Sequence, residues 1–148
     1  MGANVRVACV LPLFLFIVAP AAAEGTSKTD LESLRGTWSI ARAIHDGRVS
    51  APEKTKSVKL SFAVDKLTVH GEKGMESVFK LDAAKKPREI DVTPGSGPDK
   101  GMTLKGIYDL NGDVLKICIA KPGRDRPTEF VSKENTGVIL IELKRDKQ

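Results

Sequence analysis

The sequence predicts an all-β domain, an up-and-down antiparallel β-barrel of about eight strands. Three observations support this fold class: apolar and polar residues alternate over short runs, turn residues separate these runs, and helical spacing is almost absent. Consecutive short strands pair antiparallel, and eight of them can close into an up-and-down barrel that has no exposed edge. A two-sheet sandwich is the competing fold, because alternation alone does not distinguish the two arrangements.

The chain of 148 residues is predicted to begin with a cleaved secretory signal at residues 1–23. Arg6 precedes an apolar run at 7–19, Pro20 ends this run, and three alanines at 21–23 supply small residues for cleavage. The run is shorter than the ~20 apolar residues of a membrane-spanning helix, although an uncleaved anchor is the alternative. We therefore expect a periplasmic or secreted protein with no stable membrane insertion after cleavage.

The mature chain is expected to consist of a polar lead-in at 24–34 and one barrel domain at 35–146. Asp30, Leu31 and Leu34 give the lead-in a weak helical spacing, which is enough for a single turn. A domain of this length can bury a sufficient core without any covalent cross-link.

Cys118 is the single cysteine that remains once the predicted signal, which contains Cys9, is removed. An exported chain with one cysteine has no internal disulfide. Cys118 alternates with Ile117 and Ile119, which favours a packed thiol over a reactive or intermolecular one.

The strand boundaries follow from the alternation and from the turn residues. The first strand begins at Gly36 and ends at 46–47. Asn111-Gly112 is the strongest hairpin signal and is expected to form the turn between strands at 102–110 and 113–120. The other strands are expected at 58–62, 67–69, 75–81, 89–93 and 138–144, with a polar loop at 51–56 and a glycine- and proline-rich loop at 94–101.

Three segments of the chain carry a resemblance to a known family. Gly36-Thr37-Trp38 resembles the glycine–x–tryptophan signature of the lipocalins. The tripeptide lies within the first segment, LRGTWSIARAIHDG. The other two segments are PREIDVTPGSGPDKGMTLKGIYDLNGDVLKICIAKPGRDRPTEF and VILIELKR. Together they resemble a lipocalin-like domain family that is common among exported proteins of planctomycete bacteria, over about residues 31–145. The resemblance implies a β-barrel.

The resemblance also implies a structural role for Gly36, Trp38 and Arg145. In lipocalins the tryptophan of the first strand lies under an arginine from the end of the last strand, and Arg145, or else Lys144, occupies that place here. A guanidinium over an indole contributes about 0.5–2 kcal/mol and closes one end of the barrel.

The interior of a barrel of this size holds either packed side chains or one small ligand. Both alternatives are open at this stage. Inward positions are expected at Trp38, Ile40, Leu60, Phe62, Leu67, Val69, Met75, Phe79, Ile90, Val92, Leu104, Tyr108, Leu115, Ile117 and Leu140. The candidate ligand-binding residues are Trp38, Phe62, Phe79, Asp91, Tyr108 and Arg126, for a small apolar or amphipathic molecule.

A polar cluster is expected in the second half of the chain, formed by Asp91, Tyr108, Arg124, Arg126 and Glu129. An Asp–Arg pair with a tyrosine hydroxyl can orient a polar head group of a ligand. The alternative is a polar network that fixes the geometry of the neighbouring loops, and the adjacent glycines and prolines favour it.

Several function classes are disfavoured by the sequence. His45, His70 and Cys118 lack the spacing of a metal site, and the loop at 95–101 lacks the ending of a phosphate loop, so no cofactor is expected. No nucleophile–base spacing indicates an enzyme. The net charge of +5 comes from scattered basic residues among few aromatic ones, so no nucleic-acid partner is expected.

Two functions remain open at the level of sequence. The first is an exported binding module for a small, partly apolar ligand. The alternative is a protein-interaction or inhibitor module that acts through the loops at 94–101 and 121–128.

Overall fold

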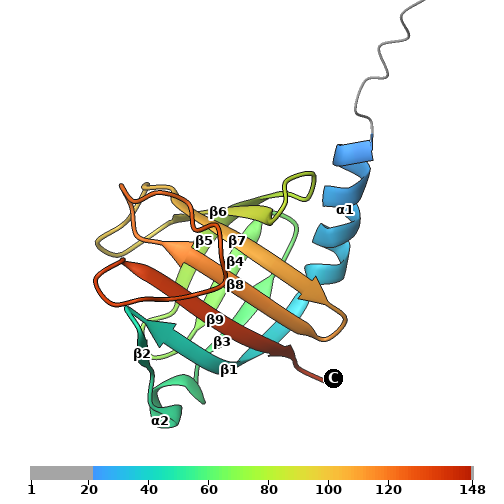
Figure 1. Cartoon of the computed structure of the whole chain (residues 1–148). Helices are drawn as coiled ribbons and strands as arrows, with labels where there is room; N and C mark the ends of the chain where they lie inside the picture. Colours follow the sequence, from blue (N-terminus) through green and yellow to red (C-terminus); the bar gives the residue numbers. More distant parts are fainter. Residues whose placement is uncertain (1–21, 148) are drawn as a thin grey trace, which may run out of the picture.

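The computed structural model describes residues 22–147, and Figure 1 shows their arrangement. Residues 1–21 of the predicted signal segment lie outside the described residues. The described part of the chain forms nine strands in one antiparallel sheet, and pairing of the first strand with the last closes this sheet. The predicted all-β antiparallel barrel is therefore confirmed.

The strands follow one another around the barrel in chain order, apart from the short β2, which pairs only with the end of β1. Eight strands make up the closed wall. The strands are β1 (Gly36–His45), β2 (Arg48–Val49), β3 (Lys59–Phe62), β4 (Lys66–His70), β5 (Met75–Asp82), β6 (Arg88–Pro94), β7 (Leu104–Asn111), β8 (Val114–Ala120) and β9 (Val138–Arg145).

The turn between β7 and β8 lies one residue later than the sequence predicted. Asn111 still belongs to β7 and pairs with Val114, so Gly112 and Asp113 form the two-residue turn. Gly112 has a φ of 59°, a left-handed conformation that glycine adopts without steric cost. The prediction of a hairpin is confirmed, and only the position of its turn is corrected.

The polar lead-in at 24–34 belongs to a helix of 13 residues, α1 (Ala22–Leu34), rather than forming a single turn. Its sequence has weak apolar spacing, and helices are often stabilised by tertiary packing more than by local propensity. Leu34 is buried in the barrel core, Leu31 packs against that core, and Asp30 binds side chains of the barrel. Figure 1 shows α1 at the end of the barrel where β1 begins and β7 ends.

A second, short helix, α2 (Pro52–Thr55), occupies the predicted polar loop at 51–56. Pro52 lies in its first turn, where a backbone N–H has no partner within the helix and its loss costs nothing.

The barrel interior is filled by inward side chains from every strand of the closed wall. Phe62 and Phe79 meet edge to face, with ring centroids 5.3 Å apart. The buried members of this core are Leu34, Trp38, Leu60, Phe62, Leu67, Phe79, Ile90, Val92, Tyr108, Leu115, Ile117 and Leu143. Most of the predicted inward positions are thus confirmed.

Leu140 was expected to point inward, and this expectation is wrong. It pairs with Cys118 and joins a second, smaller apolar cluster with Ile107, against which Phe130 packs. Positions 138–141 are all apolar, so alternation alone could not tell which face of β9 points inward.

Cys118 is fully buried within this second cluster. Its thiol donates a hydrogen bond to the Val131 carbonyl at 3.7 Å, and burial raises the pKa of the thiol. The interpretation of Cys118 as a packed thiol is confirmed.

Candidate functional site

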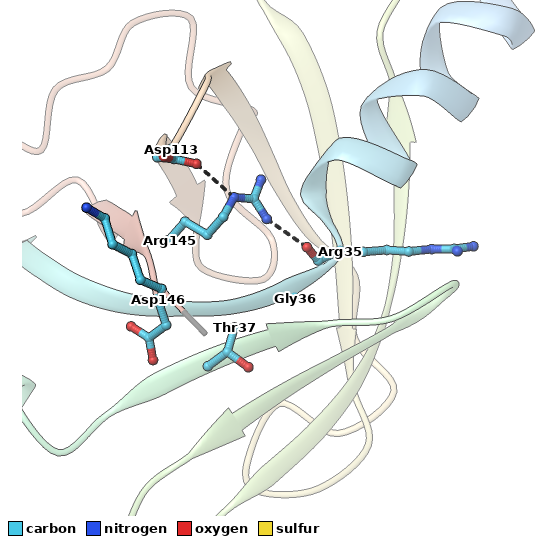
Figure 2. Close-up of a pocket in the computed structure, with 7 residues that line it drawn as sticks. Arg35, Gly36, Thr37, Asp113, Arg145 and Asp146 are labelled. Atoms are coloured by element: carbon cyan, nitrogen blue, oxygen red, sulfur yellow. Dashed lines mark hydrogen bonds and ion pairs between the residues drawn. The ribbon is translucent and has the colours of Figure 1, made fainter.

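One end of the barrel is closed by the predicted pair of Trp38 and Arg145. The Arg145 guanidinium lies 4.2 Å from the centre of the Trp38 ring, and the Trp38 indole N–H donates to the Leu34 carbonyl at 2.9 Å. Arg145 also donates to the Arg35 carbonyl and binds the Asp113 carboxylate at 3.1 Å (Figure 2). These contacts attach the end of α1 and the end of β9 to the same end of the barrel.

A hollow of about 740 Å³ lies around Arg145 at this closed end. Its lining consists of Arg35, Gly36, Thr37, Asp113, Arg145, Asp146 and Lys147, most of which Figure 2 labels. Asp146 binds Lys59 at 2.6 Å and accepts a hydrogen bond from Ser39, and these hydrogen bonds lower the pKa of its carboxyl. Arg145, Asp113 and Asp146 are already paired with other groups of the protein. The charged residues that line this hollow therefore hold the last strand on the barrel.

Tyr108 belongs to a polar group that the sequence did not predict. Its hydroxyl donates to the Asp30 carboxylate at 2.7 Å, and Arg88 binds the same oxygen at 2.9 Å. The Arg88 guanidinium also lies 5.2 Å from the centre of the Tyr108 ring. Burial and the hydrogen bond to Asp30 raise the pKa of Tyr108 well above its usual value, so the phenol is a hydrogen-bond donor at neutral pH.

Asp91 and Arg126 meet as expected, but they do so on the outer face of the barrel and without Tyr108. Arg126 binds Asp91 at 2.7 Å and donates to the carbonyls of Ile90 and Gly106 at 3.3 and 2.8 Å. This pair therefore attaches the loop at 121–128 to β6 and β7, while Arg124 and Glu129 are exposed. The arrangement is the loop-fixing network that was the alternative to a ligand site.

The six candidate ligand residues thus do not form one site, because four of them lie in the core and Asp91 and Arg126 lie on the outer face. Trp38, Phe62, Phe79 and Tyr108 are each exposed by 4% or less within the packed core. Of these, Phe79 lines two surface hollows, and Tyr108 lines a smaller one of about 290 Å³ beside Pro87 and Phe130.

The wall of the barrel is incomplete between β4 and β5, next to Phe79. The ladder between the two strands ends at the pair of Lys66 and Val78, whereas β5 continues to Asp82. The Phe79 N–H still reaches the Asp65 carbonyl at 3.0 Å, and beyond this bond the edge of β5 faces α1. The Ala83 N–H donates to the Ser27 hydroxyl at 3.0 Å, which attaches α1 beside this edge.

A hollow of about 340 Å³ lies at this gap, and we call it the side hollow. Its apolar walls come from α1, from the turn before β4 and from β5, and its two charged residues are both lysines. The lining residues are Ser27, Lys28, Leu31, Val64, Phe79, Lys80 and Leu81. A neighbouring hollow of about 430 Å³ shares Phe79 and Lys80 with it and extends to Asp65, Val78, Asp91, Thr93 and Thr103.

The sequence did not indicate the side hollow. Leu31 was recognised only as part of a weak helical spacing, and Lys28 and Lys80 look like ordinary solvated positions of a helix and a strand. The hollow exists because β4 is three residues shorter than β5 and α1 lies beside the edge that is left free. The predicted strands at 67–69 and 75–81 also differ in length, but alternation does not show what lies beside the free edge.

The described residues contain no group of three or more histidine, cysteine or acidic side chains that could hold a metal ion. Within residues 22–147, no helix is long and apolar enough to cross a membrane. No family model, curated protein or solved structure matches the chain.

Proposed function

We propose that the protein is an exported, lipocalin-like binding module for a small, partly apolar ligand, which binds in the side hollow. The observation that carries this proposal is the gap in the barrel wall, where Leu31, Val64 and Leu81 form apolar walls beside the edge of Phe79. A volume of about 340 Å³ lies at the lower end of small-molecule sites, so the hollow fits one modest ligand.

The packing of the core favours this location over a deep cup at the Trp38 end. Trp38, Tyr108 and Leu115 are each exposed by 1% or less, so a ligand there would have to displace packed side chains. The side hollow needs no such displacement, because Val64 is 60% exposed and Leu31 and Leu81 are half-buried. A ligand seated there would cover apolar surface that the fold itself leaves accessible to water.

The alternative of a protein-interaction module has less support. The loop at 121–128 is held on the barrel by the four contacts of Arg126 with Asp91, Glu89 and two backbone carbonyls. The loop at 94–101 is closed on itself, because the Gly101 N–H donates to the Pro94 carbonyl at 2.9 Å. Neither loop presents an extended apolar surface to a partner.

Titration with N-phenyl-1-naphthylamine, a neutral apolar fluorescent probe, tests the proposed site. The native protein is expected to bind the probe, and Val64→Asp is expected to weaken binding about tenfold, because a carboxylate at the rim disfavours an apolar occupant. Val49→Asp is the matched control, since Val49 is also 60% exposed but lies on β2. Equal binding by both variants would place the probe elsewhere.

Export is part of the proposal and is tested separately. It is supported by Arg6, the apolar run at 7–19 and the small residues at 21–23. Expression of the full sequence in a bacterium is expected to yield a periplasmic or secreted product that begins at Glu24, as read by N-terminal sequencing. A product that keeps residues 1–23 would overturn this part.

A further inference from the structure

We infer that the ligand of the side hollow is an amphiphile with one anionic head group, which Lys28 and Lys80 hold at the rim while its apolar part lies against Leu31 and Leu81. This inference rests on the proposed function and adds the chemical class of the ligand. The observation that carries it is that both charged residues of the hollow are positive, while most of its other lining residues are apolar.

Neither lysine has an acidic partner in the described part of the chain. Lys28 is exposed on α1 and forms no ion pair with a described side chain. Lys80 lies opposite Asp91 in the ladder of β5 and β6, but the Asp91 carboxylate binds Arg126 at 2.7 Å. The acid opposite Lys80 in the ladder is therefore engaged by Arg126, and two ammonium groups without an ion pair among the described residues lie at one apolar hollow.

The hydroxyl of Ser27 also lines the side hollow. The Ser27 oxygen accepts the Ala83 N–H at 3.0 Å, which leaves the hydrogen of the hydroxyl free to be donated. Two ammonium groups and a hydroxyl donor match a carboxylate head group, which only accepts hydrogen bonds.

The acids near the hollow set the side on which the head group binds. Asp65 and Asp91 line the neighbouring hollow, and Asp65 forms no ion pair with a described side chain. The Asp65 carboxylate disfavours an anion in that hollow, so the head group is expected in the side hollow, between Lys80 and Lys28 of α1. The apolar part then contacts Leu31, Val64 and Leu81, which line the side hollow without any acid.

Calorimetric titration of the full-chain protein with decanoate and with decanol tests the inference, because the two probes differ only in their head groups. Decanoate is expected to bind more tightly than decanol, and added salt is expected to weaken only decanoate. Lys28→Gln and Lys80→Gln are each expected to weaken decanoate about threefold and to leave decanol unchanged, as is typical of an exposed ion pair. Lys133→Gln, at an exposed position remote from the hollow, is the control.

The outcomes separate the inference from the function on which it rests. Equal affinity of the protein for decanoate and decanol would overturn the inference that the ligand has an anionic head group. Lysine variants that bind decanoate as tightly as the native protein would overturn it as well. Both results leave the proposed binding function intact. A protein that binds N-phenyl-1-naphthylamine but does not bind decanoate would also overturn the anionic head group and leave the binding function intact. Absence of binding by all three probes overturns the proposed function as well.

Discussion

The Tyr108 hydroxyl donates a hydrogen bond of 2.7 Å to the Asp30 carboxylate, 78 residues earlier in the chain. Arg88 binds the same carboxylate, so three side chains from α1, β6 and β7 meet at one end of the barrel. This contact holds α1 beside the free edge of β5, where it forms one wall of the side hollow. The site therefore depends on a polar anchor that touches no part of the hollow itself.

Replacing Asp30 tests this anchor. Asp30→Ala leaves Arg88 and Tyr108 without their shared acceptor and is expected to lower the free energy of unfolding by about 3 kcal/mol, the lower end for a buried ion pair, because both partners are partly exposed. Tyr108→Phe removes one hydrogen bond and is expected to cost about 1–2 kcal/mol. Urea denaturation measures both changes.

Asp113→Ala is the control, because Asp113 also pairs with an arginine but is 75% exposed. This variant is expected to lower the free energy of unfolding by no more than about 1 kcal/mol. Equal losses for Asp30 and Asp113 would contradict the anchor.

The ionisation of Tyr108 gives a second test, since it is the single tyrosine of the chain. Its pKa is raised in the folded protein, so the stability that it contributes is present below the unfolded pKa of ~10 and is lost as pH rises toward the folded pKa. Tyrosinate absorbance is expected to stay low at about pH 11 in the native protein and to appear when urea is added. A native protein that titrates near the value of free tyrosine would show that Tyr108 is not held by Asp30.

Removing Arg126 is expected to release the loop at 121–128 without opening the barrel. Arg126→Gln loses the ion pair with Asp91 and is expected to cost about 1–2 kcal/mol, because Arg126 is partly exposed. Limited trypsin digestion is expected to cut faster after Arg124, because Pro122 and Pro127 protect the bonds after Lys121 and Arg126. Arg124→Gln is the control for the cutting site, since it removes this bond from the substrates of trypsin and should abolish the cut in the loop. Unchanged digestion of the Arg126 variant would show that other contacts hold the loop.

Cys118 is expected to resist thiol reagents while the protein is folded. Burial raises the pKa of its thiol, and therefore little thiolate is present at neutral pH. Mass spectrometry of the peptide that contains Cys118 is expected to show modification only at the rate of unfolding. Lys133→Cys supplies an exposed thiol in the connection that covers Cys118, and this thiol should react at once. Rapid native modification of Cys118 would contradict its burial.

The barrel was predictable from the sequence because its signals are local. Alternation fixes the inward face of most strands, and Gly112 marks the hairpin of β7 and β8 to within one residue. The pair of Trp38 and Arg145 was also found, through a resemblance in which the two residues keep their places at the ends of the first and last strands.

The remaining features depend on contacts between distant segments. The position of α1 on the barrel depends on Asp30, whose partners Arg88 and Tyr108 lie far along the chain. The orientation of Leu140 follows from its pairing with Cys118, in a stretch that is apolar on both faces. The side hollow follows from the difference in length between β4 and β5 together with the position of α1 beside the free edge of β5, and the sequence pattern did not reveal that position.

The most direct test of the central claim is a ¹⁵N-resolved NMR titration of the protein with N-phenyl-1-naphthylamine. If the side hollow is the binding site, the backbone amides of Leu31, Val64, Lys80 and Leu81 shift on addition of the probe, while the Trp38 indole signal stays in place. Shifts confined to other parts of the barrel, or a displaced Trp38 indole signal with no change at Val64 and Leu81, would contradict it.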